Sequence, residues 1–331
     1  MPRLYPIRYL EAISEGLCQA MDLDKSVFVL GEGVDNVTGI YGILLPVYEK
    51  FKGERMIDTP ISENGISGIA TGAALRGLRP VLFFQRNDFM MLAMDQLMNH
   101  AAKIKFISNG RFFVPLTIVG LVARKPGEGP QHSQSLQAIF AHFPGIKVVM
   151  PANPIDAKGL LTSAIEDNDP VLILYHRDLF EEKDIVPDNY YKVPIGEPAI
   201  VKSGDDISIV AVSVAVKDAI EASDFLKTQR INPKVVDLRS VKPINKKKII
   251  DSVKKTGRLI VVDTSWKSFS LSAEILALVG EAGNYLKALP KRIALPDISA
   301  PASRVARGFY YPSAKMISNA VVEVMASRSK F

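Results

Sequence analysis

The stretch from Asp58 to Gly77 reads DTPISENGISGIATGAALRG. Its small residues recur at helical spacing, so we expect a helix over about 62–78. Each glycine inside a helix costs about 1 kcal/mol relative to alanine, which indicates that another backbone or a flat ligand approaches closely. Glu63 lies at the entrance of this helix. A carboxylate there commonly complements the helix dipole, and the residues alone favour that interpretation over proton transfer by a partly buried glutamate.

Short apolar runs alternate with amphipathic stretches on both sides of this helix. In the first half, the pattern predicts strands at 27–30, 80–84, 115–119, 147–150 and 171–175, and helices at 6–22, 88–105, 135–142 and 154–167. In the second half, it predicts strands at 207–212, 234–238 and 259–262, and helices at 214–228, 245–255, 270–283 and 313–326. Residues 178–206 hold several prolines without sustained periodicity, which is typical of a linker. We therefore expect an α/β fold of two three-layer domains with parallel sheets, over 1–190 and 191–331.

The composition is that of a soluble globular protein, with 47 % hydrophobic and 23 % charged residues among 331. A single cysteine, Cys18, excludes an internal disulfide and favours a reducing compartment. No apolar stretch near the centre is long enough for a membrane span and no secretion signal opens the chain, so we expect a cytoplasmic protein. The net charge is −4 up to Tyr190 and +10 from Tyr191 on. Such asymmetry can mark a nucleic-acid surface, but no zinc finger, basic zipper or RNA-binding aromatic pair supports one.

A second candidate segment runs from Gly120 to Ser135. It follows a predicted strand, is rich in glycine and proline, and carries His132 and Ser133 at the entrance of the next helix. A histidine there can act as an acid or base near neutral pH, although a loop histidine is more often simply solvated. The other histidines are scattered, so no zinc site is expected. Hydrolase elbows, dinucleotide fingerprints and phosphate-binding loops are absent, and the residues alone indicate a two-domain α/β protein that suits an enzyme.

Several of these motifs resemble one family. They are DTPISE at 58–63, GLRPV at 77–81, QHSQS at 131–135 and VDLRSVKP at 236–243. In order and spacing, from about residue 5 to about residue 325, they resemble the β subunit of thiamine-diphosphate-dependent 2-oxoacid dehydrogenases (E1). That family is of the pyruvate and branched-chain type and belongs to the transketolase-like superfamily. The resemblance implies a pyrimidine-binding first domain and a transketolase C-terminal-like second domain.

The resemblance also implies roles for individual residues. Glu63 would hydrogen-bond N1′ of the cofactor aminopyrimidine and favour its imino tautomer, and Phe89 would pack on the pyrimidine face. Glu32 and Gln85 would complete the cofactor pocket, with Glu32 supporting Glu63. His132 would handle protons on the substrate-derived adduct or guide the lipoyl thiol.

Three residues are candidates for contact with the substrate: His132, Ser133 and Arg86. Arg86, together with Arg124 and Lys125, could favour an anionic substrate such as a sugar phosphate. The chain has no Gly-Asp-Gly motif, in which the family places the oxygen ligands of Mg²⁺. We therefore expect no metal ligands here and a separate E1 α subunit that holds Mg²⁺ in an α2β2 heterotetramer. A lipoyl-bearing acyltransferase (E2) is implied as a downstream partner, and neither nucleic acid nor membrane is.

The chain departs from the family at three strand positions. Phe83 stands where the family usually has a glutamate, and Val119 where it has an arginine. If these strands are neighbours, an apolar pair replaces an ion pair. Tyr175 replaces a glutamate at the end of another strand, and these departures resemble a divergent bacterial branch.

The implied activity is decarboxylation of a 2-oxoacid with transfer of the acyl unit to lipoamide. Two alternatives stay open. One is a carboligase or split transketolase that passes a two-carbon unit to an aldehyde. The other is a non-catalytic regulatory subunit, against which the retention of Glu63, Phe89 and His132 argues.

Overall fold

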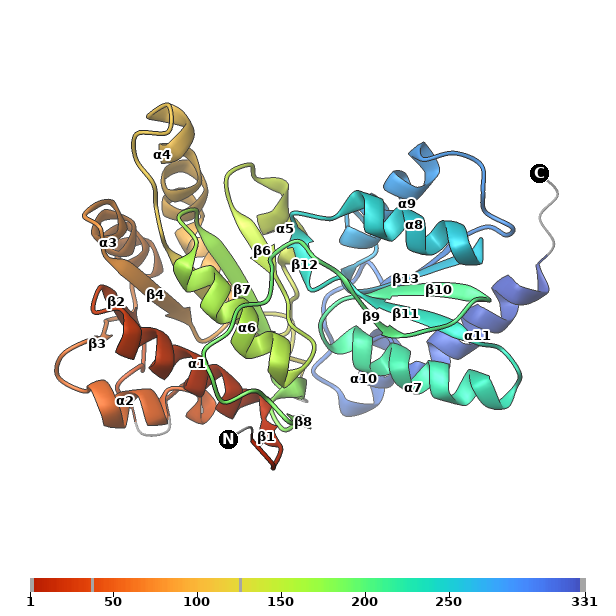
Figure 1. Cartoon of the computed structure of the whole chain (residues 1–331), viewed down its shortest axis with the longest axis horizontal. Helices are drawn as coiled ribbons and strands as arrows, with labels where there is room; N and C mark the ends of the chain where they lie inside the picture. The colour runs from red at the N-terminus through yellow and green to blue at the C-terminus, as the bar shows by residue number, and fades with distance from the viewer. Residues whose placement is uncertain (1–2, 37–38, 125–126, 328–331) are drawn as a thin grey trace. The chain divides into compact units, whose positions relative to one another are not determined.

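The computed structural model describes residues 3–36, 39–124 and 127–327 (Figure 1). By internal contacts the chain forms two compact units. The first comprises Met1–Ala123 with Ile139–Ile195, and the second comprises Arg124–Ala138 with Gly196–Phe331. The segment that carries His132 is thus built into the second unit, although strands of the first unit flank it in sequence. The domain bounds 1–190 and 191–331 stay a prediction.

The sheet of the first unit consists of parallel strands. Their spatial order is β6 (Lys147–Val149), β7 (Val171–His176), β5 (Thr117–Val122), β4 (Arg79–Phe84), β2 (Val27–Gly31) and β3 (Met56–Asp58). The central strands β5 and β7 are buried along their whole length, as continuous apolar runs in a parallel sheet predict. Their carboxyl ends share one edge, which is where ligands bind in such sheets.

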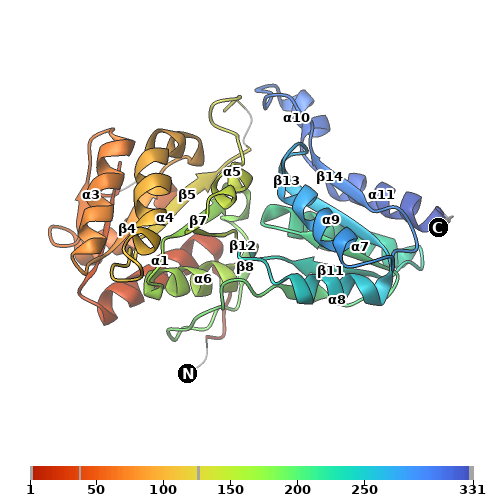
Figure 2. The same ribbon diagram turned by 90° about the horizontal axis from the view of Figure 1, so that it is seen from above.

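Helices cover both faces of this sheet, because right-handed crossovers that run in opposite directions place their helices on opposite faces. One group contains α1 (Tyr9–Leu23), α2 (Leu45–Phe51) and α6 (Pro154–Glu166), with α1 and α6 side by side (Figure 2). The other contains α3 (Glu63–Leu75), η2 (Asn87–Ala93), η3 (Asp95–Ala101) and α4 (Ala102–Ile107). The helix α5 (Gln137–His142) begins in the second unit and continues into the first. Short elements complete the unit: β1 (Ile7–Arg8) paired with β8 (Lys183–Asp184), η1 (Gly39–Gly42) and η4 (Arg177–Leu179).

One predicted helix differs from the observed one. The pattern at 88–105 predicts a single helix, but the chain forms a 3-10 turn at η2 and a π-helical turn at η3 before α4 begins. This path brings the side chain of Gln96 against α3, where a Cβ on Gly68 would lie 3.3 Å from Gln96 Oε1. A glycine at that position of α3 therefore lets the two elements pack closely.

The second unit repeats the layered plan. Its sheet has the order β14 (Lys291–Leu295), β13 (Leu259–Trp266), β10 (Ile207–Ala211), β11 (Pro233–Asp237) and β9 (Ala199–Lys202). All neighbours are parallel except β9, which runs antiparallel to β11. One face is covered by α8 (Lys246–Thr256) and α9 (Leu271–Glu281), and the other by α7 (Val214–Thr228) and α11 (Ala314–Ala326) (Figure 1). The remaining elements are β12 (Ser240–Lys242) and α10 (Arg304–Tyr310).

The prediction of a linker over 178–206 was wrong in part, because this stretch contains β8 and β9. Both strands are short and partly exposed, so neither carries the periodic apolar signal that the sequence pattern relies on. Across the described ranges, no helix combines the length and the apolar character that crossing a membrane requires.

Candidate active site

Acidic and polar side chains meet at the carboxyl edge of the first unit's sheet. Glu32 directly follows β2, Asp58 closes β3, and Glu63 opens α3. Asp58 Oδ1 accepts a hydrogen bond from the backbone N–H of Gly33 at 2.6 Å, which fixes the turn after β2. Gln85, directly after β4, donates from Nε2 to the backbone oxygen of Glu32 at 3.2 Å. The structure therefore brings together three of the predicted cofactor residues, Glu32, Glu63 and Gln85.

The acidic neighbours at this edge change the electrostatics of Glu32. Its partial burial raises its pKa, and the negative charges of Glu63 and Asp58 raise it further. A carboxyl group in such a field takes up a proton more readily than an isolated glutamate. Asp58 was not among the predicted site residues, because the short strand β3 that it closes was not predicted either.

A glycine is required at the end of β2, just before Glu32. Gly31 has φ of +150°, and a Cβ there would lie 2.4 Å from the backbone oxygen of Phe83 on the neighbouring strand. Only glycine combines that backbone conformation with such a close approach. Gly31 therefore sets the direction in which the chain leaves the sheet and places Glu32 over its edge.

The glycines of α3 only partly meet the expectation of a close neighbour. Cβ atoms on Gly65 and Gly68 would lie 2.7 Å from Ser62 Oγ and 3.3 Å from Gln96 Oε1, so these two positions are tightly packed. Gly72 has no atom of this chain within 4 Å of a Cβ position. The close neighbours in the first turns of α3 are the side chains of Ser62 and Gln96, whereas Gly72 faces open space. The approach of another backbone or a flat ligand to this helix stays a prediction.

Phe89 lies on η2, which packs against α3. Its ring is 38 % exposed, while the preceding Asn87 and Asp88 are buried. Asn87 Nδ2 donates to Asp88 Oδ2 at 3.1 Å and to the backbone oxygen of Leu121 at 3.3 Å, which anchors η2 to β5. An accessible aromatic ring on η2 and a half-buried carboxylate, Glu63, on the adjoining helix are the two groups that an aminopyrimidine needs. The residues present therefore fit that ring.

Arg86 belongs to a second cluster on the same edge. Its Nη1 donates to the hydroxyl of Tyr41 and, at 3.0 Å, to the backbone oxygen of Gln85. The Cζ atoms of Arg86 and of Arg177, which follows β7, lie 5.3 and 3.7 Å from the centroid of the Tyr41 ring. Two guanidinium groups thus contact one aromatic ring, an arrangement in which the ring face attracts the cations. Sequence reasoning missed Tyr41 and Arg177.

His132 and Ser133 belong to the second unit and are held there by a buried polar network. Gln137 Nε2 donates to Asp263 Oδ1 at 2.9 Å and to Thr264 Oγ1 at 3.0 Å. Ser135 Oγ donates to Gln137 Oε1 at 2.7 Å, and all four of these side chains are buried. The network fastens the start of α5 to the carboxyl half of β13. No sequence signal marks Asp263 as a partner of Gln137, because 126 residues separate them.

The loop before this network is fastened as well. The backbone N–H of Gly127 donates to the oxygen of Ala302 at 3.1 Å. Ser133 is 4 % exposed and hydrogen-bonds to Tyr311, whose pKa burial raises to about 12. His132 itself is half-buried on this loop. The geometry of Ser133 thus suits an anchor, while the imidazole of His132 is partly accessible.

Within the described ranges, no three histidine, cysteine, aspartate or glutamate side chains gather in a way that could hold a metal ion.

Comparison with known proteins adds to this geometry. Residues 6–183 match the family model of the transketolase pyrimidine binding domain, and residues 196–317 match that of the transketolase C-terminal domain. A solved structure described as a split gene transketolase, inactive beta4 tetramer, aligns with a TM-score of 0.79, covering 98 % of this chain and 100 % of that one. At 20 % identity, that likeness shows the fold.

Curated relatives are closer in sequence. The chain is 39 % identical to the 2-oxoisovalerate dehydrogenase subunit beta of Bacillus subtilis (strain 168), over 88 % of this chain and 90 % of that protein. It is 38 % identical to the pyruvate dehydrogenase E1 component subunit beta of Rickettsia bellii (strain RML369-C), over 95 % and 97 %. It is also 38 % identical to the acetoin:2,6-dichlorophenolindophenol oxidoreductase subunit beta of Cupriavidus necator, over 95 % and 96 %. The family expected from the motifs is thereby confirmed, and the chain belongs to the β subunits of thiamine-diphosphate-dependent 2-oxoacid dehydrogenases of the transketolase-like superfamily.

Proposed function

We propose that this chain is the β subunit of an E1 enzyme that decarboxylates a 2-oxoacid and passes the acyl unit to lipoamide. The observation that carries the proposal is the cluster of Glu32, Asp58 and Glu63 at the carboxyl edge of the first sheet, together with the exposed Phe89 on η2, which packs against α3. The names of the pyruvate and 2-oxoisovalerate dehydrogenase relatives support a 2-oxoacid as the substrate.

The roles of the cofactor residues follow from their chemistry. Glu63 would hydrogen-bond N1′ of the aminopyrimidine, and Phe89 would pack against the face of that ring. Burial and the charges of Glu63 and Asp58 raise the pKa of Glu32, so Glu32 takes up a proton more readily than an isolated glutamate, which would limit the repulsion between Glu32 and Glu63. Gln85 fixes the main chain of Glu32. When bound, thiamine diphosphate supplies the carbanion chemistry itself.

The remaining predicted residues serve the substrate. His132, partly accessible on its fastened loop, moves protons on the substrate-derived group, and a histidine can do so near neutral pH. Ser133 keeps that loop in place through Tyr311. Arg86 offers a guanidinium for the carboxylate or phosphate of the substrate.

The proposal includes a partner chain. An E1 α subunit would hold Mg²⁺ and the cofactor diphosphate in an α2β2 heterotetramer, and a lipoyl-bearing acyltransferase (E2) would accept the product. Support comes from the relatives, which are named as beta subunits. We also propose that the complex lies in the cytoplasm.

The test is to express the chain with its α subunit and to compare Glu63→Gln with the wild type. We expect Glu63→Gln to lower the rate of decarboxylation by about 10²–10⁴-fold, as for loss of a proton-transfer group. Glu49→Gln is the control, since Glu49 is exposed on α2. Wild-type activity in Glu63→Gln would overturn the proposal.

The second candidate function is that of a carboligase or split transketolase, which passes a two-carbon unit to an aldehyde. One finding favours it, the similarity to acetoin oxidoreductase β subunits. Acetoin is a hydroxyketone, so its cleavage, like carboligation, uses a two-carbon unit without loss of a carboxylate. The assembled enzyme should therefore be offered 2-oxoacids and acetoin as donors, with lipoamide and aldehydes as acceptors. Activity with 2-oxoacid and lipoamide supports the first candidate, and activity only with acetoin or aldehydes supports the second. A complete lack of cofactor binding by the assembled protein would favour the regulatory alternative.

A further inference from the structure

The sheet of the second unit has an open edge at β14. This strand pairs in parallel with β13 on one side, and along the described part of the chain no strand pairs with its other side. An unpaired edge presents backbone N–H and C=O groups that another extended segment can pair with.

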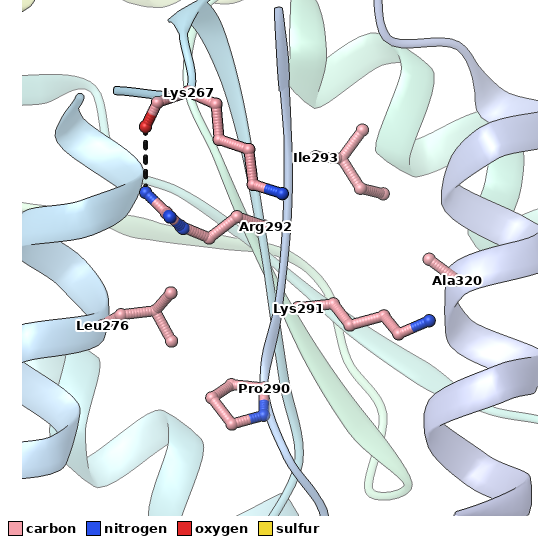
Figure 3. Close-up of a pocket in the computed structure, with 7 residues that line it drawn as sticks. All are labelled: Lys267, Leu276, Pro290, Lys291, Arg292, Ile293 and Ala320. Carbon is pink, nitrogen blue, oxygen red and sulfur yellow. Dashed lines mark hydrogen bonds between the residues drawn. The ribbon is translucent and has the colours of Figure 1, made fainter. Parts of the chain in front are cut away.

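A cavity of about 460 Å³ follows this edge (Figure 3). It is lined by residues of β14 and the preceding proline, by the residue that follows β13, and by residues of α9 and α11: Lys267, Leu276, Pro290, Lys291, Arg292, Ile293 and Ala320. Successive side chains of a strand point to opposite faces, so a cavity lined by four consecutive residues runs along the edge of the strand. We call this cavity the β14 groove.

The two sides of the β14 groove differ in chemistry. Lys267, Arg292 and Leu276 lie on one side of the strand, and Lys291, Ile293 and Ala320 on the other (Figure 3). Arg292 Nη1 donates to the backbone oxygen of Lys267 at 2.9 Å, which holds the guanidinium on its side of the groove.

The charges on the two sides are balanced differently. Lys291 forms an ion pair with Glu323 of α11. Within the described ranges, neither Lys267 nor Arg292 has a carboxylate at ion-pair distance. One side of the groove therefore holds two cations that have no acidic partner in the described part of the chain. The other side is apolar, apart from the ion pair of Lys291 with Glu323.

We propose that the β14 groove binds an extended acidic segment of a partner protein, which adds to β14 as a further strand. Alternate side chains of an added strand would point to the two sides of the groove. Acidic side chains would meet Lys267 and Arg292, and the apolar side chains between them would meet Ile293 and Ala320. The net charge of +10 from Tyr191 on attracts such a segment. The proposal uses none of the residues assigned to catalysis.

The test measures fluorescence anisotropy of a labelled peptide of alternating valine and glutamate, titrated with the full chain. We expect binding that weakens at least about tenfold, or about 1.4 kcal/mol, in the double variant Lys267→Glu with Arg292→Glu. Lys227→Glu is the matched control, because Lys227 is exposed on α7 and does not line the groove. The double variant Lys267→Gln with Arg292→Gln removes the charges without reversing them, and it is used if the first variant does not fold.

A second peptide separates strand addition from simple charge attraction. The same sequence with N-methyl groups on alternate residues keeps its charge but cannot donate along one backbone edge. We expect it to bind at least about tenfold more weakly. Equal binding by the methylated peptide, complete displacement by inorganic phosphate, undiminished binding by the charge variants, or no binding by the wild type would each overturn the proposal.

Discussion

Phe83 on β4 and Val119 on β5 lie opposite each other in parallel register, with exposed fractions of 1 % and 0 %. The motif comparison indicated a glutamate and an arginine at these two positions in the family, and left open whether the two strands are neighbours. The structure shows that they are. In this chain an apolar contact occupies the place of an ion pair in the middle of the sheet, and such an exchange can leave stability unchanged.

This pairing makes a double-mutant prediction. Phe83→Glu should lower the free energy of unfolding by about 3–5 kcal/mol, because it buries a carboxylate opposite an apolar side chain. Adding Val119→Arg should recover about 0.5–3 kcal/mol of that loss through direct pairing. Denaturant unfolding of the wild type, both single variants and the double variant gives the coupling energy. A double variant that loses the sum of the two single losses would contradict the pairing.

The network around Asp263 predicts a loss of order in the loop that carries His132. Asp263 Oδ1 accepts from Gln137 Nε2 at 2.9 Å, and Oδ2 accepts from the backbone N–H of Ser272 at 2.9 Å. Asp263→Asn turns one of these acceptors into a donor, so it should lower the free energy of unfolding by about 1.5–3 kcal/mol. It should also make amide exchange faster over residues 127–138. The control is Asp297→Asn, since Asp297 is exposed and its side chain accepts a hydrogen bond from Ser268 Oγ at 3.2 Å. Unchanged exchange in Asp263→Asn would mean that the network does not hold the loop.

Two glycine substitutions should act in opposite directions. Gly31→Ala places a Cβ against the backbone oxygen of Phe83, so it should destabilise the first unit by about 1–3 kcal/mol and displace Glu32. Gly72→Ala adds a methyl group where this chain has no atom within 4 Å, so it should stabilise the isolated chain by about 0.5–1 kcal/mol. Thermal unfolding of the two variants provides the measurement. Stabilisation by Gly31→Ala, or destabilisation by Gly72→Ala, would contradict the packing described for these positions.

Local patterns predicted much of the fold because they depend on neighbouring residues. The helix expected at 62–78 forms as α3, and the buried strands β4 and β7 appear within one residue of their predicted ends. The strand β14 was missed, because a strand at the border of a sheet carries a weaker apolar pattern than a central one. Glu32 and Glu63, which the resemblance pairs, follow strands that end at the same edge, and the charge of Glu63 helps to raise the pKa of Glu32.

The parts that could not be predicted depend on contacts between distant residues. Nothing between Gly120 and Ser135 shows that this loop is built into the second unit, since the bonds from Gln137 to Asp263 and from Gly127 to Ala302 join positions far apart in sequence. The sequence does not predict the contact of Arg86 and Arg177 with Tyr41 either, because these three residues lie far apart along the chain. The sequence shows which residue types carry the chemistry, and long-range packing decides which of them meet.

The raised pKa of Glu32 predicts a pH-dependent stability. Partial burial, then the charges of Glu63 and Asp58, favour the protonated form of Glu32 in the folded protein. The folded state thus binds the proton of the Glu32 carboxyl more tightly than the unfolded chain does. In an unfolded chain a glutamate has a pKa of about 4.3. The contribution of Glu32 to stability is fully present below that pH and is lost as the pH rises through the folded pKa.

Glu32→Gln removes this dependence, because glutamine stays neutral throughout. The variant should therefore melt above the wild type at about pH 7.5, by about 1–2 °C for a group that is partly screened by solvent, and the difference should shrink toward about pH 4.5. Melting temperatures of the wild type, Glu32→Gln and the exposed control Glu49→Gln are compared at several pH values. If the melting temperatures of the wild type and Glu32→Gln run parallel over the pH range, the charges of the acidic neighbours do not affect Glu32. A difference that narrows toward acid pH only in Glu32→Gln would tie the effect to the cluster at the carboxyl edge of β2.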